Sequence, residues 1–326
     1  MKYSKLGKTG IRVSKICFGT MGFGWMEKES DPKDILEKAI DLGVNFFDTA
    51  NVYSRGKCEE ILGTTMKDRR DDVIIATKAF WSFKRPADTG LSRPFLIKEI
   101  KESLQRLQTN YVDLFLIHRF DTSTSIENVL KTLNGLIDEG KILHIGASSM
   151  YAWEFTKSLW LADKLGLEGF QVSQPHYNLL YREEERELLP LCKDQQIGVI
   201  PWGPLARGVL TGKYSSTNKP NTKRAKIDSD LEQWFLHPQD FAIVERVVEL
   251  AKEKDVSPAQ IALAWMLSKD VITAPIVGIT AMKHLEEAVE AVELNLSEKD
   301  ISYLEELYQP RFLTGHYSGK ALAGDE

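Results

Sequence analysis

The stretch GVNFFDTANVYS, residues 43–54, decides the fold that the sequence predicts. Its first half is mostly apolar, and the titratable side chains of Asp48 and Tyr53 follow. Continuous apolar runs are typical of strands that are buried on both faces of a parallel sheet. In α/β barrels, the loops after such strands build the active site. We therefore expect Asp48 at a strand end and Tyr53 in the loop just beyond it.

Two later runs repeat this arrangement. DVIIATKAF at 72–80 places Lys78 near the end of an apolar run, and YVDLFLIHRF at 111–120 does the same for His118. Because the carboxyl ends of barrel strands meet at one rim, the side chains that follow them should converge. A tyrosine beside a lysine and an aspartate is a proton donor whose pKa can be tuned.

Strand-like and helix-like patterns alternate along the chain, as expected for eight strand–helix units. The expected strands lie at 16–19, 44–48, 72–77, 112–117, 142–146, 169–173, 197–201 and 273–277. The expected helices include 32–42, 93–108, 125–139, 151–165, 182–193 and 282–292. The sequence thus predicts an α/β fold, a (β/α)8 TIM barrel that occupies residues 1–326 as one domain. YSKLG and KTGIRVS, at 3–14, predict a β-hairpin before the barrel.

Residues 204–238 interrupt the alternation with a polar segment rich in Lys, Asn, Ser and Pro. Connections of this length are unusual and are generally functional or disordered. One alternative is a linker between two domains. Because the strand–helix rhythm resumes afterwards, we expect a long loop after the seventh strand that covers a cofactor.

Composition narrows the class of protein. The chain has 43% hydrophobic and 27% charged residues, as in ordinary globular proteins. It contains no run of about 18 apolar residues, and its N-terminus lacks the apolar core of a signal peptide. The net charge of −5 argues against nucleic-acid binding. The cysteines, Cys17, Cys58 and Cys192, have no metal-like spacing, so we expect no metal site and a reduced, cytoplasmic location.

Tyr53 is a candidate proton donor to a carbonyl oxygen. An unperturbed tyrosine has a pKa of about 10, too high for efficient proton exchange near neutral pH. The ammonium of Lys78 would lower that pKa, and Asp48 would hold the lysine charged. His118 would orient the carbonyl or share in a proton relay. A rival role for Lys78, the Schiff base of barrel aldolases, needs a neutral amine, which Asp48 opposes.

Four motifs occur in one order along the chain: DTANVYS at 48–54, LIHRFD at 116–121, GASSM at 146–150 and PWGPLARGVLTGKY at 201–214. Together with Lys78 they resemble the aldo-keto reductase family over nearly the whole chain. The resemblance is nearest to the bacterial aryl-alcohol dehydrogenase-like and potassium-channel-β-like branches. It implies that Asp48, Tyr53, Lys78 and His118 form the family's catalytic tetrad, with Tyr53 as the general acid, and that the hairpin plugs the bottom of the barrel.

The resemblance also implies a nicotinamide coenzyme across the barrel mouth, since no GxGxxG motif occurs in a Rossmann context. Ser148 and Gln174 match positions that bind the nicotinamide carboxamide, and Trp202 matches an aromatic that stacks on the nicotinamide. The cofactor-binding residues implied are Gly19, Thr20, Met21, Asp48, Ser148, Gln174, Trp202, Gly203, Leu205, Arg207, Gly208, Gly278, Thr280, His284, Glu287 and Ala288.

The sequence departs from the family pattern at two positions. Ser149 stands where relatives often have Asn, and Thr280 stands where many carry an Arg or Lys for the adenosine 2′-phosphate. Lys283, His284 and a helix N-terminus are still available to that phosphate. The resemblance therefore implies NADPH, with NADH as an alternative.

Aromatic side chains on predicted loops favour a pocket for flat, apolar carbonyl compounds such as aryl aldehydes. The expected substrate-binding residues are Trp25, Tyr53, Trp81 and His118, and the further aromatic candidates are Phe80, Trp234 and Phe235.

Besides an NADPH-dependent reductase of small carbonyl compounds, two functions stay open. One is a redox-sensing regulatory subunit, as in the potassium-channel β proteins, which keep the fold and act by binding a partner. The other is a reductase of a sugar phosphate. Formation of 1-deoxyxylulose 5-phosphate by carboligation is disfavoured, because the chain lacks the GDG…N segment of thiamine-diphosphate enzymes. The sequence does not indicate an oligomeric state.

Overall fold

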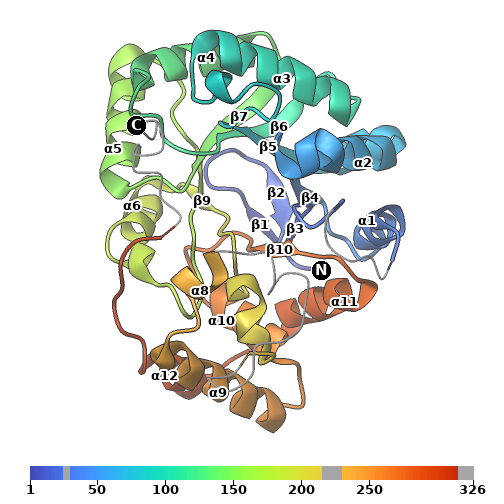
Figure 1. The fold of residues 1–326 in the computed structure, drawn as a ribbon, viewed down its shortest axis with the longest axis vertical. Coiled ribbons are helices and arrows are strands. Elements are labelled where there is room, and N and C mark those ends of the chain that lie inside the picture. The colour runs from blue at the N-terminus through green and yellow to red at the C-terminus, as the bar shows by residue number, and fades with distance from the viewer. Residues whose placement is uncertain (25–29, 215–229, 315–326) are drawn as a thin grey trace.

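The computed structural model describes residues 1–24, 30–214 and 230–314. Over these residues, eight parallel strands follow one another around a barrel in the order β10-β3-β4-β5-β6-β7-β8-β9 (Figure 1). The strands are β3 (Cys17–Gly19), β4 (Phe46–Asp48), β5 (Ile74–Ala79), β6 (Val112–Ile117), β7 (Ile142–Ser148), β8 (Val172–Gln174), β9 (Gly198–Val199) and β10 (Ile276–Gly278). The predicted (β/α)8 barrel is confirmed.

The barrel closes between β9 and β10. The backbone N–H of Thr273 donates to the Val199 carbonyl at 2.8 Å, and that of Ile276 donates to the Pro201 carbonyl at 2.8 Å. Because the strands are parallel throughout, their carboxyl ends meet at one rim, where the loops that carry the candidate residues begin.

Helices surround the strands (Figure 1). They are α1 (Pro32–Asp41), α2 (Lys57–Met66), α3 (Arg93–Leu107), α4 (Ile126–Asp138), α5 (Ala152–Leu165), α6 (Leu188–Gln195), α8 (Asp230–Trp234), α9 (Pro238–Glu253), α10 (Pro258–Leu267), α11 (Met282–Glu290) and α12 (Glu298–Glu305). The helix predicted at 182–193 begins later than expected, because Glu183–Glu185 form a separate 3-10 turn.

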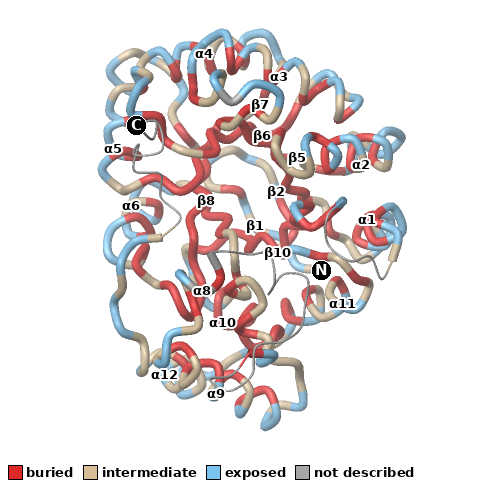
Figure 2. Tube along the Cα trace, viewed as in Figure 1, coloured by how far each residue is buried: buried red, intermediate tan, exposed pale blue. Residues whose placement is uncertain are grey.

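Apolar side chains form two layers in this barrel. One layer lies inside it and includes Phe46, Leu114 and Val172, and the other lies between the strands and the helices. Figure 2 shows the strands as almost continuously buried, whereas the helices alternate between buried and exposed faces. This is the pattern that amphipathic helices packed on buried parallel strands should give.

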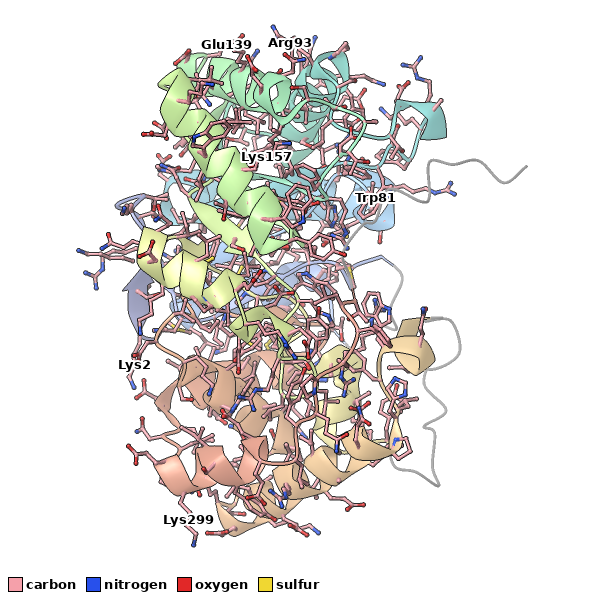
Figure 3. All side chains as sticks on the ribbon, turned by 90° about the vertical axis from the view of Figure 1, so that its left-hand side faces the viewer. Lys2, Trp81, Arg93, Glu139, Lys157 and Lys299 are labelled. Atoms are coloured by element: carbon pink, nitrogen blue, oxygen red, sulfur yellow. The ribbon has the colours of Figure 1, made fainter. Side chains whose placement is uncertain are left out.

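A hairpin closes the amino-terminal end of the barrel, as expected. β1 (Tyr3–Lys5) pairs antiparallel with β2 (Arg12–Ser14), and the neighbouring side chains of Leu6 and Val13 are fully buried in the interior layer. In Figure 3, Lys2 and Trp81 lie on opposite sides of the molecule. The hairpin therefore leaves the opposite rim, at the carboxyl ends of the strands, for a site.

The long connection predicted at 204–238 follows β9. Its described parts contain a 3-10 segment at Ala206–Thr211 and the short helix α8. Residues 215–229 of the predicted loop lie outside the described residues.

Gly7 should be indispensable to the hairpin. Its φ is +55°, and a Cβ built there would lie 2.5 Å from the backbone nitrogen of Gly198. Gly10 has a φ of +81° but open space around it. Gly10→Ala should cost only the left-handed backbone penalty, about 1–2 kcal/mol. Gly7→Ala should lower the free energy of unfolding in urea by at least about 1 kcal/mol more, because the backbones overlap. Equal losses would show that the hairpin is not held against the barrel at Gly7.

Candidate active site

A buried ion pair lies at the carboxyl ends of β4 and β5. The Lys78 Nζ donates to Asp48 Oδ1 at 2.6 Å and to the Thr49 carbonyl oxygen at 2.6 Å. The Lys78 side chain has no exposed surface. In the register of the two strands Asp48 lies opposite Ala76, two residues before Lys78. The expected convergence of Asp48 and Lys78 is therefore what the barrel produces.

Gln174, at the end of β8, completes the hydrogen bonding of this pair. Its Nε2 donates to Asp48 Oδ2 at 2.9 Å, although 126 residues separate the two in sequence. Both carboxylate oxygens of Asp48 thus have a donor. Ser148 lies beside this glutamine and donates its hydroxyl to the Gln174 carbonyl at 3.1 Å.

Tyr53 and His118 stand next to the ion pair. Tyr53 enters a tight turn in which Ser54 and Arg55 have φ values of +45° and +56°, in the left-handed region. This turn brings the Tyr53 ring centroid to 4.9 Å from the Lys78 Nζ. The ring of His118 meets that of Tyr53 edge-on, with centroids 5.8 Å apart. All four predicted catalytic residues therefore lie together.

The pKa of Tyr53 differs from the expectation. Burial raises the pKa of Tyr53, and the positive charge of Lys78 offsets only part of that increase. The net direction is upward, so the phenol is protonated at neutral pH. The ammonium lowers the pKa as expected, but the cost of desolvating a phenolate in an enclosed site is larger.

Burial also sets the charge of the neighbouring groups. Burial alone would lower the pKa of Lys78. The Asp48 carboxylate and Tyr53 raise it by more than burial lowers it, so the amine stays protonated. Burial raises the pKa of Asp48 despite the opposing effect of Lys78. Burial, Arg119 and Lys78 hold the pKa of His118 well below its usual range. The imidazole is therefore neutral at physiological pH.

A cavity of about 890 Å³ opens in front of these side chains. Its wall contains Asp48, Tyr53, Trp81 and His118. It also contains nearly all the predicted cofactor-binding residues, namely Gly19, Met21, Ser148, Gln174, Trp202, Gly203, Leu205, Arg207, Gly208, Gly278, Thr280, His284, Glu287 and Ala288.

A few predicted residues lie elsewhere. Thr20 is fully buried and donates its hydroxyl to the Asp48 carbonyl at 3.0 Å, so it supports the strand end behind the wall. Phe80 and Phe235 are buried core residues, whereas Trp234 does line the cavity. Trp25 lies outside the described residues.

Trp202 presents an indole in this wall. One face stacks on His176, with centroids 4.1 Å apart and planes 8° apart. The Nε1 donates to the Ser149 hydroxyl at 3.0 Å. Ser149, which departs from the family pattern, thus fixes the orientation of the ring.

The cavity suits an extended dinucleotide. Gly208 and Gly278 line it with no atom within 4 Å of where a Cβ would stand, so their backbones can approach a ligand closely. Arg207 and Lys213 provide positive charge for a diphosphate. The buried Nδ1 of His118 has no hydrogen-bond partner in the described part of the chain.

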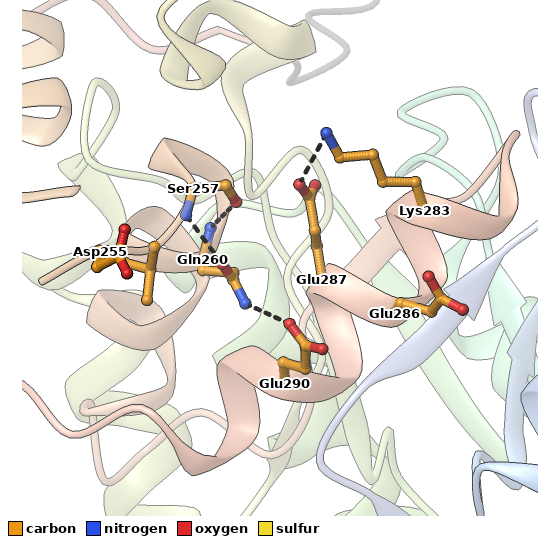
Figure 4. Close-up of a pocket in the computed structure, with 8 residues that line it drawn as sticks. Asp255, Ser257, Gln260, Lys283, Glu286, Glu287 and Glu290 are labelled. Carbon is orange, nitrogen blue, oxygen red and sulfur yellow. Dashed lines mark hydrogen bonds and ion pairs between the residues drawn. The ribbon is translucent and has the colours of Figure 1, made fainter. Parts of the chain in front are cut away.

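The end of the cavity at α11 is mixed in charge. Lys283 Nζ lies 3.7 Å from Glu287 and its side chain is 80% exposed, while the Thr280 hydroxyl lies 3.4 Å from His284 Nδ1. An adjoining hollow of about 380 Å³ is lined by further acids, including Glu286 and Glu290. Figure 4 shows the Lys283 amine facing the Glu287 carboxylate, while the carboxylates of Asp255, Glu286 and Glu290 lie farther from this lysine. A phosphate at this end of the cavity would therefore meet Lys283, whose positive charge Glu287 partly neutralises.

Sequence patterns did not indicate several of the residues that line the cavity. Arg119, His176, Lys213 and Tyr214 line the wall but were given no role there. Arg119 could have been found, because it directly follows His118 in a loop predicted to face the site. His176 and Tyr214 lie in irregular segments, where no periodicity indicates a direction.

Comparison with known proteins agrees with this geometry. A sequence profile of the aldo/keto reductase family matches residues 15–309. The chain belongs to the aldo/keto reductase family. Members of the family use nicotinamide coenzymes, and the family and its relatives support an oxidoreductase that acts on carbonyl groups of small molecules.

Individual relatives cover nearly the full chain. A versiconal hemiacetal acetate reductase of Aspergillus parasiticus is 38% identical over 341 residues, 95% of this chain and 98% of that protein. A Schizosaccharomyces pombe protein provisionally named an aryl-alcohol dehydrogenase is also 38% identical, with 94% and 96% coverage. So is an Oryza sativa subsp. japonica protein provisionally named a voltage-gated potassium channel subunit beta, over 301 residues, with 90% and 92% coverage.

No group of three or more His, Cys, Asp or Glu side chains in residues 1–24, 30–214 and 230–314 is placed to hold a metal ion. Within the same ranges, every helix is too short or too polar to cross a membrane.

Lys78→Met should expose the energetics of the buried pair. The variant leaves the Asp48 carboxylate buried without its cation, so the free energy of unfolding should fall by about 3–5 kcal/mol at pH 8. Burial already raises the pKa of Asp48 with Lys78 present, and without Lys78 its folded-state pKa should rise further above the unfolded value. The loss should therefore shrink toward pH 5, where Asp48 is protonated in the folded state.

Urea unfolding at pH 5 and pH 8 would measure this difference. The matched control is Lys78→Met combined with Asp48→Asn, which removes the carboxylate that titrates. Its loss of unfolding free energy relative to the wild type should be smaller and should be the same at pH 5 and pH 8. A Lys78→Met deficit of the same size at both pH values would contradict the ion pair.

Proposed function

We propose that this protein reduces aldehydes or ketones to alcohols with NADPH, and that Tyr53 is the general acid. The observation that supports this most is the protonated Tyr53 on the cavity wall, with the fixed charge of Lys78 4.9 Å from its ring centroid. A proton donor backed by a buried cation fits the stabilisation of charge on a carbonyl oxygen.

The reaction consumes one carbonyl compound, one NADPH and one proton, and yields an alcohol and NADP⁺. A reduced nicotinamide, when bound, would supply a hydride to the carbonyl carbon. Tyr53 gives its proton to the carbonyl oxygen, and Lys78 stabilises the phenolate that is left. Asp48 keeps Lys78 charged and in place, and the neutral His118 holds the carbonyl oxygen.

Different residues along the cavity would bind different parts of the coenzyme. Ser148 and Gln174 would hold the nicotinamide carboxamide, and Trp202 would cover the nicotinamide ring with its free face. Arg207 would meet the diphosphate. Thr280 and His284 would meet the adenosine 2′-phosphate, beside the acids at α11. Because no arginine in the described part of the chain lies at that end of the cavity, the preference for NADPH over NADH should be modest.

A partner-binding, regulatory role is the second candidate, since a relative of equal identity is named as a channel subunit. The two roles separate in one assay. A panel of aldehydes and ketones, followed by absorbance of NADPH and NADH, should show sustained turnover if reduction is the function. Coenzyme binding without turnover on any member of the panel would favour the regulatory role.

Tyr53→Phe removes the acidic hydroxyl and keeps the ring that packs beside His118. The variant should fold and bind NADPH normally, while kcat for reduction falls about 100-fold or more. Coenzyme binding by fluorescence titration is the control for an intact cavity. If the variant retains more than about a tenth of the wild-type kcat, Tyr53 is not the general acid.

Thr280→Arg should increase the preference for NADPH. A guanidinium can bind the 2′-phosphate through two parallel hydrogen bonds, so the Kd for NADPH should fall about ten- to a hundredfold, or about 1.4–2.7 kcal/mol. NADH, which lacks that phosphate, is the internal control and should bind almost as before. Equal shifts for both coenzymes would place the 2′-phosphate elsewhere.

A further inference from the structure

Arg119 is a cation in the substrate end of the cavity with no role in the chemistry above. It follows His118 just beyond the end of β6, so both side chains reach the cavity wall instead of alternating across a strand. Its Nη1 donates to the carbonyl oxygen of His118 at 2.6 Å. Its guanidinium carbon lies 5.1 Å from the ring centroid of Trp81.

No carboxylate in the described part of the chain pairs with this guanidinium, and the nearby acids have other partners. Asp48 accepts from Lys78 and Gln174. Asp121, two residues after the arginine, accepts from the backbone of Leu91 and from Ser123 and Thr124. An arginine has five N–H donors. Within the described residues those of Arg119 make one hydrogen bond, to the His118 carbonyl oxygen, so most of them have no partner there.

The guanidinium is nevertheless charged. Burial lowers the pKa of Arg119 to about 10, well above neutral pH. Proteins rarely enclose a cation without an anionic partner, because the lost hydration is not replaced. Stacking on Trp81 replaces part of it, but this contact does not use the planar edge of the guanidinium that carries its hydrogen-bond donors.

We propose that Arg119 binds an anionic group of the substrate, so that the physiological substrates are carbonyl compounds that also carry a carboxylate or phosphate. This inference rests on the proposed function. Tyr53 and His118 would hold the carbonyl, and the adjacent Arg119 would hold the anion a short distance away. Trp81, which contacts both His118 and Arg119, would cover the apolar spacer between the two groups.

Matched substrate pairs test this assignment. The carboxylate pair is 4-formylbenzoate and its neutral methyl ester, and the phosphate pair is glyceraldehyde 3-phosphate and glyceraldehyde. The wild type should prefer the charged member of at least one pair in kcat/KM. Arg119→Met should reduce that preference at least about tenfold, as expected for lost hydrogen bonds to a charged group. Arg119→Lys should retain part of it.

The matched control is Arg93→Met, an exposed arginine at the start of α3 that should leave both ratios unchanged. The pair that responds to Arg119→Met identifies the anion as carboxylate or phosphate. If Arg119→Met lowers kcat/KM for charged and neutral members alike, Arg119 assists proton transfer and the proposal is overturned. A wild type without preference in either pair overturns it too, while turnover of the neutral aldehydes leaves the proposed reductase function standing.

A binding measurement covers a wild type that turns over none of these substrates. In that case the reductase function fails, but titration with 4-formylbenzoate and with glyceraldehyde 3-phosphate, followed by tryptophan fluorescence, still reports on the cavity. The Kd of one of these anions should rise at least about tenfold in Arg119→Met. If the wild type and Arg119→Met bind each anion with equal affinity, or if the wild type binds neither anion, the assignment is overturned.

Discussion

The buried pair of Lys78 and Asp48 is the interaction on which the rest of the site depends. Taking two charges out of water costs several kcal/mol per ion, so such a pair persists only with well-placed further hydrogen bonds. The Thr49 carbonyl and the Gln174 amide provide them. Because these groups come from β4, β5 and β8, the site exists only when the barrel has closed. The fold and the chemistry of the protein therefore share one set of contacts.

Burial also decides which groups in the site carry a charge. Lys78 stays positive behind the wall, while Tyr53 and His118 stand in front as neutral groups, since burial raises the pKa of one and lowers that of the other. A neutral donor can transfer a proton without first losing a solvation shell. The fixed charge then acts on whatever negative charge develops nearby. Only an enclosed cavity produces this arrangement, because water would screen the lysine.

The sequence predicted the barrel, the hairpin and the convergence of Asp48, Tyr53, Lys78 and His118, because strand ends are visible as apolar runs that stop at titratable residues. It could not predict that Gln174 binds Asp48, since that contact joins residues 126 apart and depends on barrel closure. Lys78 lowers the pKa of Tyr53 as expected, but burial outweighs this effect, and burial cannot be read from local sequence. Glu183–Glu185 were placed in a helix because a 3-10 turn and a helix share similar local composition.

The two ends of the described chain differ in where they lie relative to the cavity. Lys2 and Trp81 lie on opposite sides of the molecule in Figure 3. Thr314, in contrast, lies 3.2 Å from the Nδ1 of His176, a residue of the cavity wall. Tethering the protein to a solid support through its amino terminus would therefore turn the mouth of the barrel toward solution. An attachment at Thr314 would place the linker beside the entrance.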